Sequence, residues 1–214
     1  LLGSLDLQDD GAGLNERIAL MRSPVFIKQA LSKLPLDITY NRKGTILNQE
    51  QYKTNPYVVD AQVNNKDIYG IPIYIQFTSK ATYAISYFLP GDVSRNQEFS
   101  ISEPAVFPEV TLNVSLRNTG QGIATSYNLL NSTFFFILND PSNIAGYYAD
   151  RIFINIANPQ AKTISIAYTD RNPEKVADIV NAIAVEFLAY DVAKKAESAD
   201  KTLEFIDKQM SKSY

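Results

Sequence analysis

The 214-residue chain contains no cysteine, no histidine and no tryptophan. The lack of cysteine excludes disulfides, thiolate catalysis and cysteine-type metal sites. The lack of histidine removes the most common general base near neutral pH and the most common metal ligand. A Ser-His-Asp triad, a histidine zinc site and a histidine facial triad are therefore excluded. Carboxylate, lysine or tyrosine chemistry remains possible.

Long apolar runs and blocks of positive charge are missing as well. No stretch approaches the roughly 18–20 apolar residues that span a bilayer. The net charge is -3 and no basic block occurs, so nucleic-acid binding is not expected. The chain starts at Leu1 without Met, which favours a piece of a longer protein. With 45% hydrophobic and 20% charged residues, the composition is typical of a globular domain with a core.

The first segment is predicted to form two helices that meet at a serine. Apolar residues with helical spacing mark the first helix: Leu14, Ile18 and Met21. Ser23 and Pro24 follow as an N-cap and a first helical residue. The same spacing marks the second helix: Ile27, Ala30, Leu31 and Leu34. Pro35 is expected to end it, because proline cannot continue a helix.

The middle of the chain is predicted to be a β-rich insertion at about 41–131. Short apolar or alternating runs occur at 36–40, 57–63, 71–78, 82–89 and 110–116. Asn64-Asn65 and Pro90-Gly91-Asp92 separate some of them and predict turns.

Three more strands and a short helix are expected before the C-terminal segment. The continuous apolar run 133–138 predicts a strand buried on both faces. Asp140 and Pro141 predict a helix start, as cap and first residue, with the helix reaching about Ala149. Residues 153–157 and 163–168 are the further strand candidates.

The C-terminal segment predicts one long helix that begins at Asn172-Pro173-Glu174. No Gly or Pro follows, so it can hold about 38 residues and reach about 57 Å. A compact chain of this length is only about 40–45 Å across, so the helix should extend beyond its domain. It carries two apolar stripes: Val176, Val180, Ile183, Phe187, and then Ala199, Leu203, Ile206, Met210. The second stripe either packs on the chain's own core or meets another subunit.

Few side chains suggest catalysis or ligand binding. Asp170 and Glu174 could be an acid and base pair, but capping of the helix start is the simpler interpretation. Asn181 is unfavourable inside a helix, which suggests a hydrogen bond to a neighbouring loop rather than a ligand contact. Asp9-Asp10 and Gly120-Gln121-Gly122 are interpreted as a solvated leader and a turn.

Aromatic residues are numerous, with 13 Tyr and 11 Phe. Exposed clusters of such rings can stack on sugars, and four tyrosines of the predicted β-rich segment are candidates: Tyr52, Tyr57, Tyr69 and Tyr74. Strands favour aromatic residues in any case, so ordinary use in strands and core is the simpler interpretation.

Two segments together resemble the polysaccharide co-polymerase or chain-length determinant family, including the extracytoplasmic part of bacterial exopolysaccharide tyrosine autokinases. The first, 14–40, is LNERIALMRSPVFIKQALSKLPLDITY, with Ser23 at its helix junction. The second, 164–210, is ISIAYTDRNPEKVADIVNAIAVEFLAYDVAKKAESADKTLEFIDKQM. The positions that match the family pattern in the second segment are Ser165, Asp170, Pro173, Ala177, Asn181, Lys195, Phe205 and Ile206. Both segments together cover about a third of the chain.

This resemblance implies a periplasmic domain of a bacterial inner-membrane protein, with a membrane helix on either side of this chain. Such proteins form ring-like homo-oligomers that regulate the chain length or export of polysaccharides such as lipopolysaccharide, next to the polymerase or export machinery. The β-rich insertion resembles the branch that carries a cytoplasmic tyrosine kinase domain. We therefore expect a non-catalytic scaffold without cofactor or metal.

The expected fold is α+β: helices packed on a mixed sheet, a β-rich insertion and a long C-terminal helix, in a single domain at 1–214. Two other functions stay open. An envelope glycan-binding module would need a groove lined by aromatic rings, and a carboxylate hydrolase would need two acidic groups in one pocket.

Overall fold

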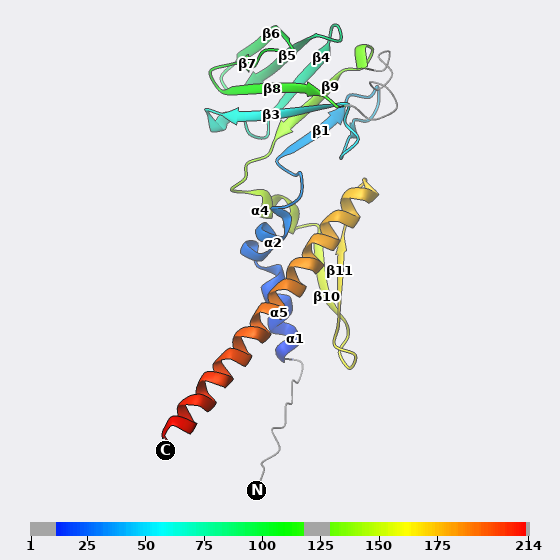
Figure 1. The fold of residues 1–214 in the computed structure, drawn as a ribbon. Coiled ribbons are helices and arrows are strands. Elements are labelled where there is room, and N and C mark those ends of the chain that lie inside the picture. The colour runs from blue at the N-terminus through cyan, green and yellow to red at the C-terminus, as the bar shows by residue number, and fades with distance from the viewer. Residues whose placement is uncertain (1–11, 118–128, 213–214) are drawn as a thin grey trace. The chain divides into compact units, whose positions relative to one another are not determined.

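The computed structural model describes residues 12–117 and 129–212, and the chain divides into two compact units. The terminal unit combines both ends of the chain, Leu1–Leu34 and Ala145–Tyr214, and the β unit is Pro35–Ile144. The α+β class and the long C-terminal helix are confirmed (Figure 1). All described strand pairs are antiparallel, a more uniform arrangement than the mixed sheet that we predicted. The predicted insertion at 41–131 falls within the β unit, and the single domain stays a prediction.

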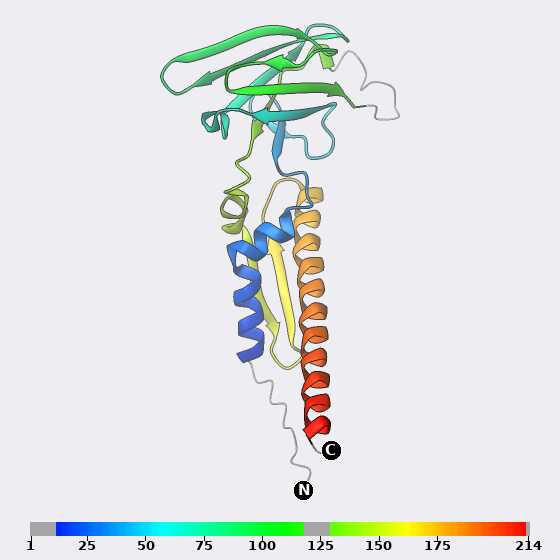
Figure 2. The same cartoon turned by 60° about the vertical axis from the view of Figure 1, so that its left-hand side comes forward.

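In the terminal unit, helices lie against a two-stranded hairpin (Figure 2). Its elements are α1 (Ala12–Arg22), α2 (Pro24–Leu31), the end of α4 (Ile144–Ala149), β10 (Ile152–Asn158), β11 (Thr163–Tyr168) and α5 (Pro173–Lys212). Helix α1 contacts β10 and α2, while α5 contacts α2 and β11. The first and last parts of the chain therefore share one core.

The junction of α1 and α2 follows the prediction. Ser23 is the N-cap of α2, where its hydroxyl accepts a hydrogen bond from Phe26 N at 3.2 Å, and Pro24 is the first helical residue. The predicted apolar faces are buried: Leu14, Ile18, Met21, Ile27, Ala30 and Leu31. Arg22 Nε donates to the carbonyl of Ile154 at 3.1 Å, which ties the end of α1 to β10.

The hairpin of β10 and β11 has one apolar face that the helices cover. Its inward residues pair across the two strands: Ile152 with Tyr168, Ile154 with Ile166, and Ile156 with Ile164. These six side chains are buried or half-buried, whereas the alternating residues between them are exposed. The period of two residues is that of a strand with one covered face.

The β unit consists of two antiparallel sheets. The six-stranded sheet has the order β2-β1-β9-β4-β5-β6, and the three-stranded sheet has the order β3-β8-β7. The strands of the first sheet are β1 (Ile38–Arg42), β2 (Gln49–Glu50), β4 (Pro72–Phe77), β5 (Thr82–Leu89), β6 (Val93–Ser100) and β9 (Phe134–Leu138). Those of the second are β3 (Tyr57–Val63), β7 (Ala105–Val106) and β8 (Val110–Leu116), with the 3-10 helix η1 (Lys66–Ile68) after β3.

A shared apolar core holds the two sheets together. Alternate residues enter it from both sheets, among them Tyr57, Val59, Ile73, Ile75, Phe77, Tyr83, Ile85, Tyr87, Leu112, Val114, Phe134 and Phe136. Phe135 on the other face of β9 is also buried and contacts the ring of Tyr74, so β9 is covered on both faces as predicted. The turn before β6 needs positive φ at Gly91 (+83°) and Asp92 (+60°), as the turn prediction implied.

Several element boundaries differ from the prediction. Helix α2 ends at Leu31 rather than at Pro35, because Ser32 to Leu34 form turns that bond back to Gln29 and Leu31. The helix predicted to start at Asp140-Pro141 begins only at Ile144. Asp140 Oδ1 accepts from Ser142 N at 2.8 Å and thereby holds a turn ahead of the helix.

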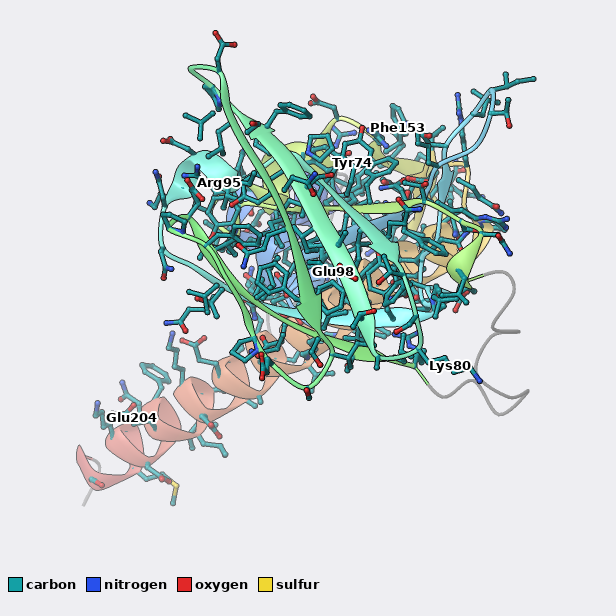
Figure 3. The ribbon with its side chains drawn as sticks, turned by 90° about the horizontal axis from the view of Figure 1, so that it is seen from above. Tyr74, Lys80, Arg95, Glu98, Phe153 and Glu204 are labelled. Carbon is teal, nitrogen blue, oxygen red and sulfur yellow. The ribbon has the colours of Figure 1, made fainter. Side chains whose placement is uncertain are left out.

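A buried carboxylate joins the two sheets. Glu109, just before β8, accepts from Tyr87 Oη of β5 at 2.8 Å and from Arg95 Nη2 of β6 at 2.6 Å. The Arg95 hydrogen bond lowers the pKa of Glu109 below its usual value; burial opposes this, and the Tyr87 hydrogen bond supports it. Burial and the Glu109 carboxylate raise the pKa of Tyr87. Figure 3 labels Arg95 and, on the same strand, Glu98.

We predict that Glu109→Gln lowers the free energy of unfolding by about 1–3 kcal/mol at neutral pH, because Arg95 loses a buried charged partner. The folded pKa of Glu109 is lowered, so its stabilising effect is complete above the unfolded pKa of about 4.3. The effect disappears as the pH falls through the lower folded pKa. Urea unfolding of both proteins at neutral and acid pH, followed by circular dichroism, measures the difference.

Glu98→Gln is the matched control, because Glu98 is an exposed carboxylate on the same strand as Arg95. It should change stability by no more than about 0.5 kcal/mol. Equal losses in the two variants, or a Glu109 effect that grows toward acid pH, would contradict the assignment.

Candidate functional site

A buried carboxylate fixes the start of α5. Asp170 Oδ1 accepts from Asn172 N at 3.0 Å, and its Oδ2 accepts from Tyr168 Oη at 3.1 Å. The same Oδ2 lies 3.6 Å from Lys175 Nζ and 3.5 Å from Arg151 Nη1. Asn172 caps the helix, since its Oδ1 accepts from Lys175 N at 3.1 Å. The end of β11 and the first turn of α5 are therefore held as one piece.

The geometry excludes Asp170 and Glu174 as an acid and base pair that share one pocket. The side chain of Asp170 is 6% exposed and surrounded by donors, whereas Glu174 is exposed. Burial raises the pKa of Asp170, but the Asn172 N–H, the Lys175 charge and the Tyr168 hydroxyl together lower it below its usual value. Asp170 is therefore an ionised structural carboxylate, and its role goes beyond the simple helix cap that we predicted.

One face of the first half of α5 packs against its own chain. The buried residues on this face are Lys175, Ile179, Ile183 and Glu186. Our predicted stripe shares only Ile183 with that set, while Val176, Val180 and Phe187 are half-buried beside it. Glu186 accepts from Gln29 Nε2 of α2 at 2.5 Å, and this bond helps to hold the two helices in register.

A second face of α5 carries a continuous apolar seam that nothing within the described chain covers. We call this set the α5 seam: Val185, Ala189, Val192, Ala196, Ala199, Leu203, Ile206 and Met210. The spacing alternates between four and three residues throughout, which is the heptad pattern of a coiled coil. All eight side chains are exposed, and the three largest are 61%, 47% and 59% exposed, in the order Leu203, Ile206, Met210.

The seam includes the four predicted residues Ala199, Leu203, Ile206 and Met210 and extends farther toward the start of the helix. The structure excludes packing of these four on the described core of their own chain, since all of them are exposed. Sequence reasoning missed Val185, Ala189, Val192 and Ala196. Their alternating spacing was a signal that could have found them.

The two faces of α5 point in different directions. At about 100° per residue, the centre of the seam lies about 125° around the helix axis from the buried face of Lys175, Ile179, Ile183 and Glu186. The last turns of α5 also extend past the ends of α1 and of the β10–β11 hairpin (Figures 1 and 2). The seam is therefore open along its full length with respect to residues 12–34 and 145–212 of this unit.

Ion pairs within the helix stabilise the exposed half of α5. Three acid–lysine pairs span four residues each: Asp191–Lys195 at 2.7 Å, Glu197–Lys201 at 2.5 Å and Glu204–Lys208 at 2.5 Å. The acid comes first in each pair, which is the favoured order, and each contributes about 0.2–0.5 kcal/mol. Figure 3 shows Glu204 on this part of the helix. The last two pairs occupy b and f positions of the heptad, on the side of the helix opposite the seam, so they leave its apolar surface free.

A groove of about 580 Å³ lies between α1 and α5 on a side of the helix away from the seam. Its walls are joined by ion pairs, with Lys194 Nζ 3.3 Å from Glu16 and Arg17 Nη2 3.8 Å from Asp191. These contacts position α1 on α5.

The remaining predicted residues take structural or exposed positions. Asn181 is exposed, and no hydrogen bond joins its side chain to another described residue, so the expected bond to a loop is not seen. Tyr52 and Tyr57 are buried, which removes them as exposed stacking platforms. Tyr69 and Tyr74 are half-buried. Asp9-Asp10 and Gly120-Gln121-Gly122 lie outside the described residues.

Within the described part of the chain, no helix is both long and apolar enough to cross a membrane. The same residues contain no group of three or more acidic side chains that could hold a metal ion.

No family model matches the chain, and no curated protein sequence matches it. Two crystal structures of FlgL from Xanthomonas campestris, in space groups H3 and C2, align with it at 13% and 12% sequence identity. The alignments cover 70% and 83% of this chain and 41% and 55% of the FlgL chains, with TM-scores of 0.25 and 0.27. The chain thus spans about half the length of these proteins, and a likeness at such TM-scores carries no argument about function.

We predict that Asp170→Asn lowers the free energy of unfolding of the terminal unit by about 3 kcal/mol, because Lys175 and Arg151 lose the nearby negative charge. Glu174→Gln is the matched control at the same helix end, and its exposed side chain should cost less than about 0.5 kcal/mol. Hydrogen exchange of the first turns of α5 locates the effect. Unchanged protection in Asp170→Asn would show that the carboxylate does not anchor the helix.

Proposed function

We propose that this chain is a non-catalytic, periplasmic scaffold domain of a bacterial inner-membrane protein that regulates polysaccharide chain length or export. It acts by assembling with copies of itself through the α5 seam. The observation that carries the proposal is the seam itself: eight exposed apolar residues in heptad spacing on one face of a 40-residue helix.

Covering the exposed seam would supply the free energy for self-assembly. Large apolar side chains on a free helix face gain about 25 cal/mol for each Å² that a partner covers. Heptad spacing lets such residues insert between those of a facing helix along the whole contact. A second α5 offers the same spacing and length, so it is a matching partner for the seam.

Charges beside the seam favour parallel over antiparallel packing of two α5 helices. In the heptad, Lys195 occupies a g position, and Asp200 and Asp207 occupy e positions. In a parallel pair, Lys195 of one copy faces Asp200 of the other. In an antiparallel pair, the aspartates of the two copies face one another and repel. Parallel packing is the arrangement that subunits anchored side by side in one membrane require.

The link to polysaccharides rests on the sequence resemblance in 14–40 and 164–210. Both segments belong to the terminal unit, apart from the last residues of the first, and together they build the framework that holds α5. The matching positions include Asp170 and Pro173 at the helix start and Ile206 in the seam.

We predict that this chain by itself self-associates weakly at high concentration, since the flanking membrane helices that the resemblance implies would be needed to concentrate it. Ile206→Glu should raise the dissociation constant at least about tenfold, or about 1.4 kcal/mol, because a charge would be buried in the seam. Phe205→Glu is the matched control: Phe205 is a neighbouring apolar residue that is also exposed, 62% against 47%, and it lies on a different face of the helix. Sedimentation equilibrium measures both.

Three outcomes would contradict this assembly: equal weakening by the two variants, no association of the starting protein at any concentration, or a tight small dimer as its sole state. In cells that produce the intact parent protein, Ile206→Glu should alter the length distribution of the exported polysaccharide, and Phe205→Glu should not. Gel analysis of the polysaccharide separates this function from assembly alone. An unchanged distribution with Ile206→Glu would overturn the polysaccharide role.

A further inference from the structure

A cleft of about 430 Å³ opens in the β unit beside the edge of the three-stranded sheet. One wall is β3, the edge strand of that sheet, and the other comes from β1 and the residues after β9. Its volume lies within the range of about 300–1,000 Å³ that is typical of small-ligand pockets. All its lining residues belong to the β unit, so the cleft is defined within that unit.

The edge of β3 is blocked for strand addition. An extended peptide can add to a free sheet edge by pairing with its backbone groups. Here the Tyr40 hydroxyl forms hydrogen bonds with both the backbone N–H and the backbone C=O of Val59, in the middle of β3. It accepts from Val59 N at 3.0 Å and donates to Val59 O at 3.4 Å. A peptide strand would have to break both bonds, so the cleft favours a ligand that is held by side chains.

Most of the cleft is lined by aliphatic side chains and prolines, and two aromatic rings and three hydrogen-bond acceptors stand among them. Tyr40 and Tyr69 are half-buried in its wall, and Asp37 and Asp60 are exposed at it. Asn139 donates through Nδ2 to the Leu36 carbonyl at 2.6 Å and to Thr39 Oγ1 at 2.9 Å, which leaves its Oδ1 as an acceptor. Among the described residues that line the cleft, none is basic.

We infer that this cleft binds a neutral saccharide of one or two pyranose units. The C–H face of a pyranose packs against an aromatic ring, which Tyr69 supplies. Its hydroxyl groups donate to carboxylate and amide oxygens, which Asp37, Asp60 and Asn139 supply. The two carboxylates, with no cationic residue beside them in the lining, disfavour uronic acids and other acidic sugars by repulsion.

The cleft shares no residue with the α5 seam, so sugar binding does not depend on self-assembly. Of the four tyrosines that the sequence offered as stacking residues, only Tyr69 lines the cleft. The others lie elsewhere: Tyr52 and Tyr57 are buried, and Tyr74 packs on Phe135. No sequence pattern indicated the other polar residues of the cleft, because Asp37, Asp60 and Asn139 come from three separate strands or loops.

The test is a titration of the chain with neutral trisaccharides of glucose, galactose and mannose and with trigalacturonate, followed by NMR of isotope-labelled protein. At least one neutral trisaccharide should bind with a dissociation constant on the order of 1 mM or tighter, and shifts should centre on β3 and residues 37–40. Trigalacturonate should bind at least about tenfold more weakly. Absence of binding by every neutral sugar, or stronger binding of the uronate, would overturn the inference.

Substitutions locate the site. Asp37→Asn and Asp60→Asn keep the side-chain shape at exposed positions, and each should weaken the neutral sugar at least about threefold, while Tyr69→Ala should abolish binding. Glu98→Gln, an exposed carboxylate of the same unit outside the cleft, should leave affinity unchanged. Binding that is insensitive to both aspartate changes would place the sugar elsewhere and overturn the assignment, even if Tyr69→Ala fails to fold.

Discussion

The burial of Ile179 and Ile183 fixes the rotation of α5 about its own axis, and that rotation determines which residues remain exposed along the rest of the helix. An uninterrupted α-helix transmits orientation at about 100° per residue, so two buried positions set the direction of every later side chain. The ion cluster at Asp170 fixes the same helix at its first turn. Together these contacts present the α5 seam as one continuous apolar stripe, which drifts around the helix by about 20° per heptad.

The two units use buried charge in a similar way. In each, one carboxylate is placed where strands or helices meet and is surrounded by donors from separate segments: Asp170 in the terminal unit and Glu109 in the β unit. Such clusters add little net stability compared with an apolar core. Their donors have defined directions, however, and a wrong register would leave a charge buried without a partner. The two clusters therefore favour the native register of the surrounding strands and helices over alternative registers.

Elements with strong periodicity could be predicted from the sequence. The Ser23-Pro24 junction, the strand with Ile73, Ile75 and Phe77, and the start of α5 at Pro173 all follow from local spacing and capping. Strand β6 (Val93–Ser100) could not be predicted, because the sequence VSRNQEFS is polar and an edge strand needs few apolar residues. Its place depends on pairing with β5, a contact that local pattern does not encode.

The candidate site could be predicted only in part, because only some of its residues form a recognisable local pattern. Three of the last four seam residues are large and apolar, so they stand out in the sequence. The first four are two valines and two alanines, and the alanines look like ordinary helix residues. The buried face was misplaced because Lys175 and Glu186 are charged, and charged residues are rarely buried without partners. Only the fold shows that Asp170 and Gln29 supply those partners. The cleft residues are distant in sequence and gave no pattern.

The seam also changes in bulk along its length. From Val185 to Ala199 it is built of valine and alanine, and from Leu203 to Met210 of leucine, isoleucine and methionine. Helix axes pack about 8 Å apart across small side chains and about 10 Å apart across large ones. Two copies in parallel contact would therefore diverge by about 2 Å over a distance of about 38 Å. In a parallel bundle whose seams all face one central axis, this wedge angle of a few degrees would make the assembly a cone that widens toward the C-terminal end of the helices.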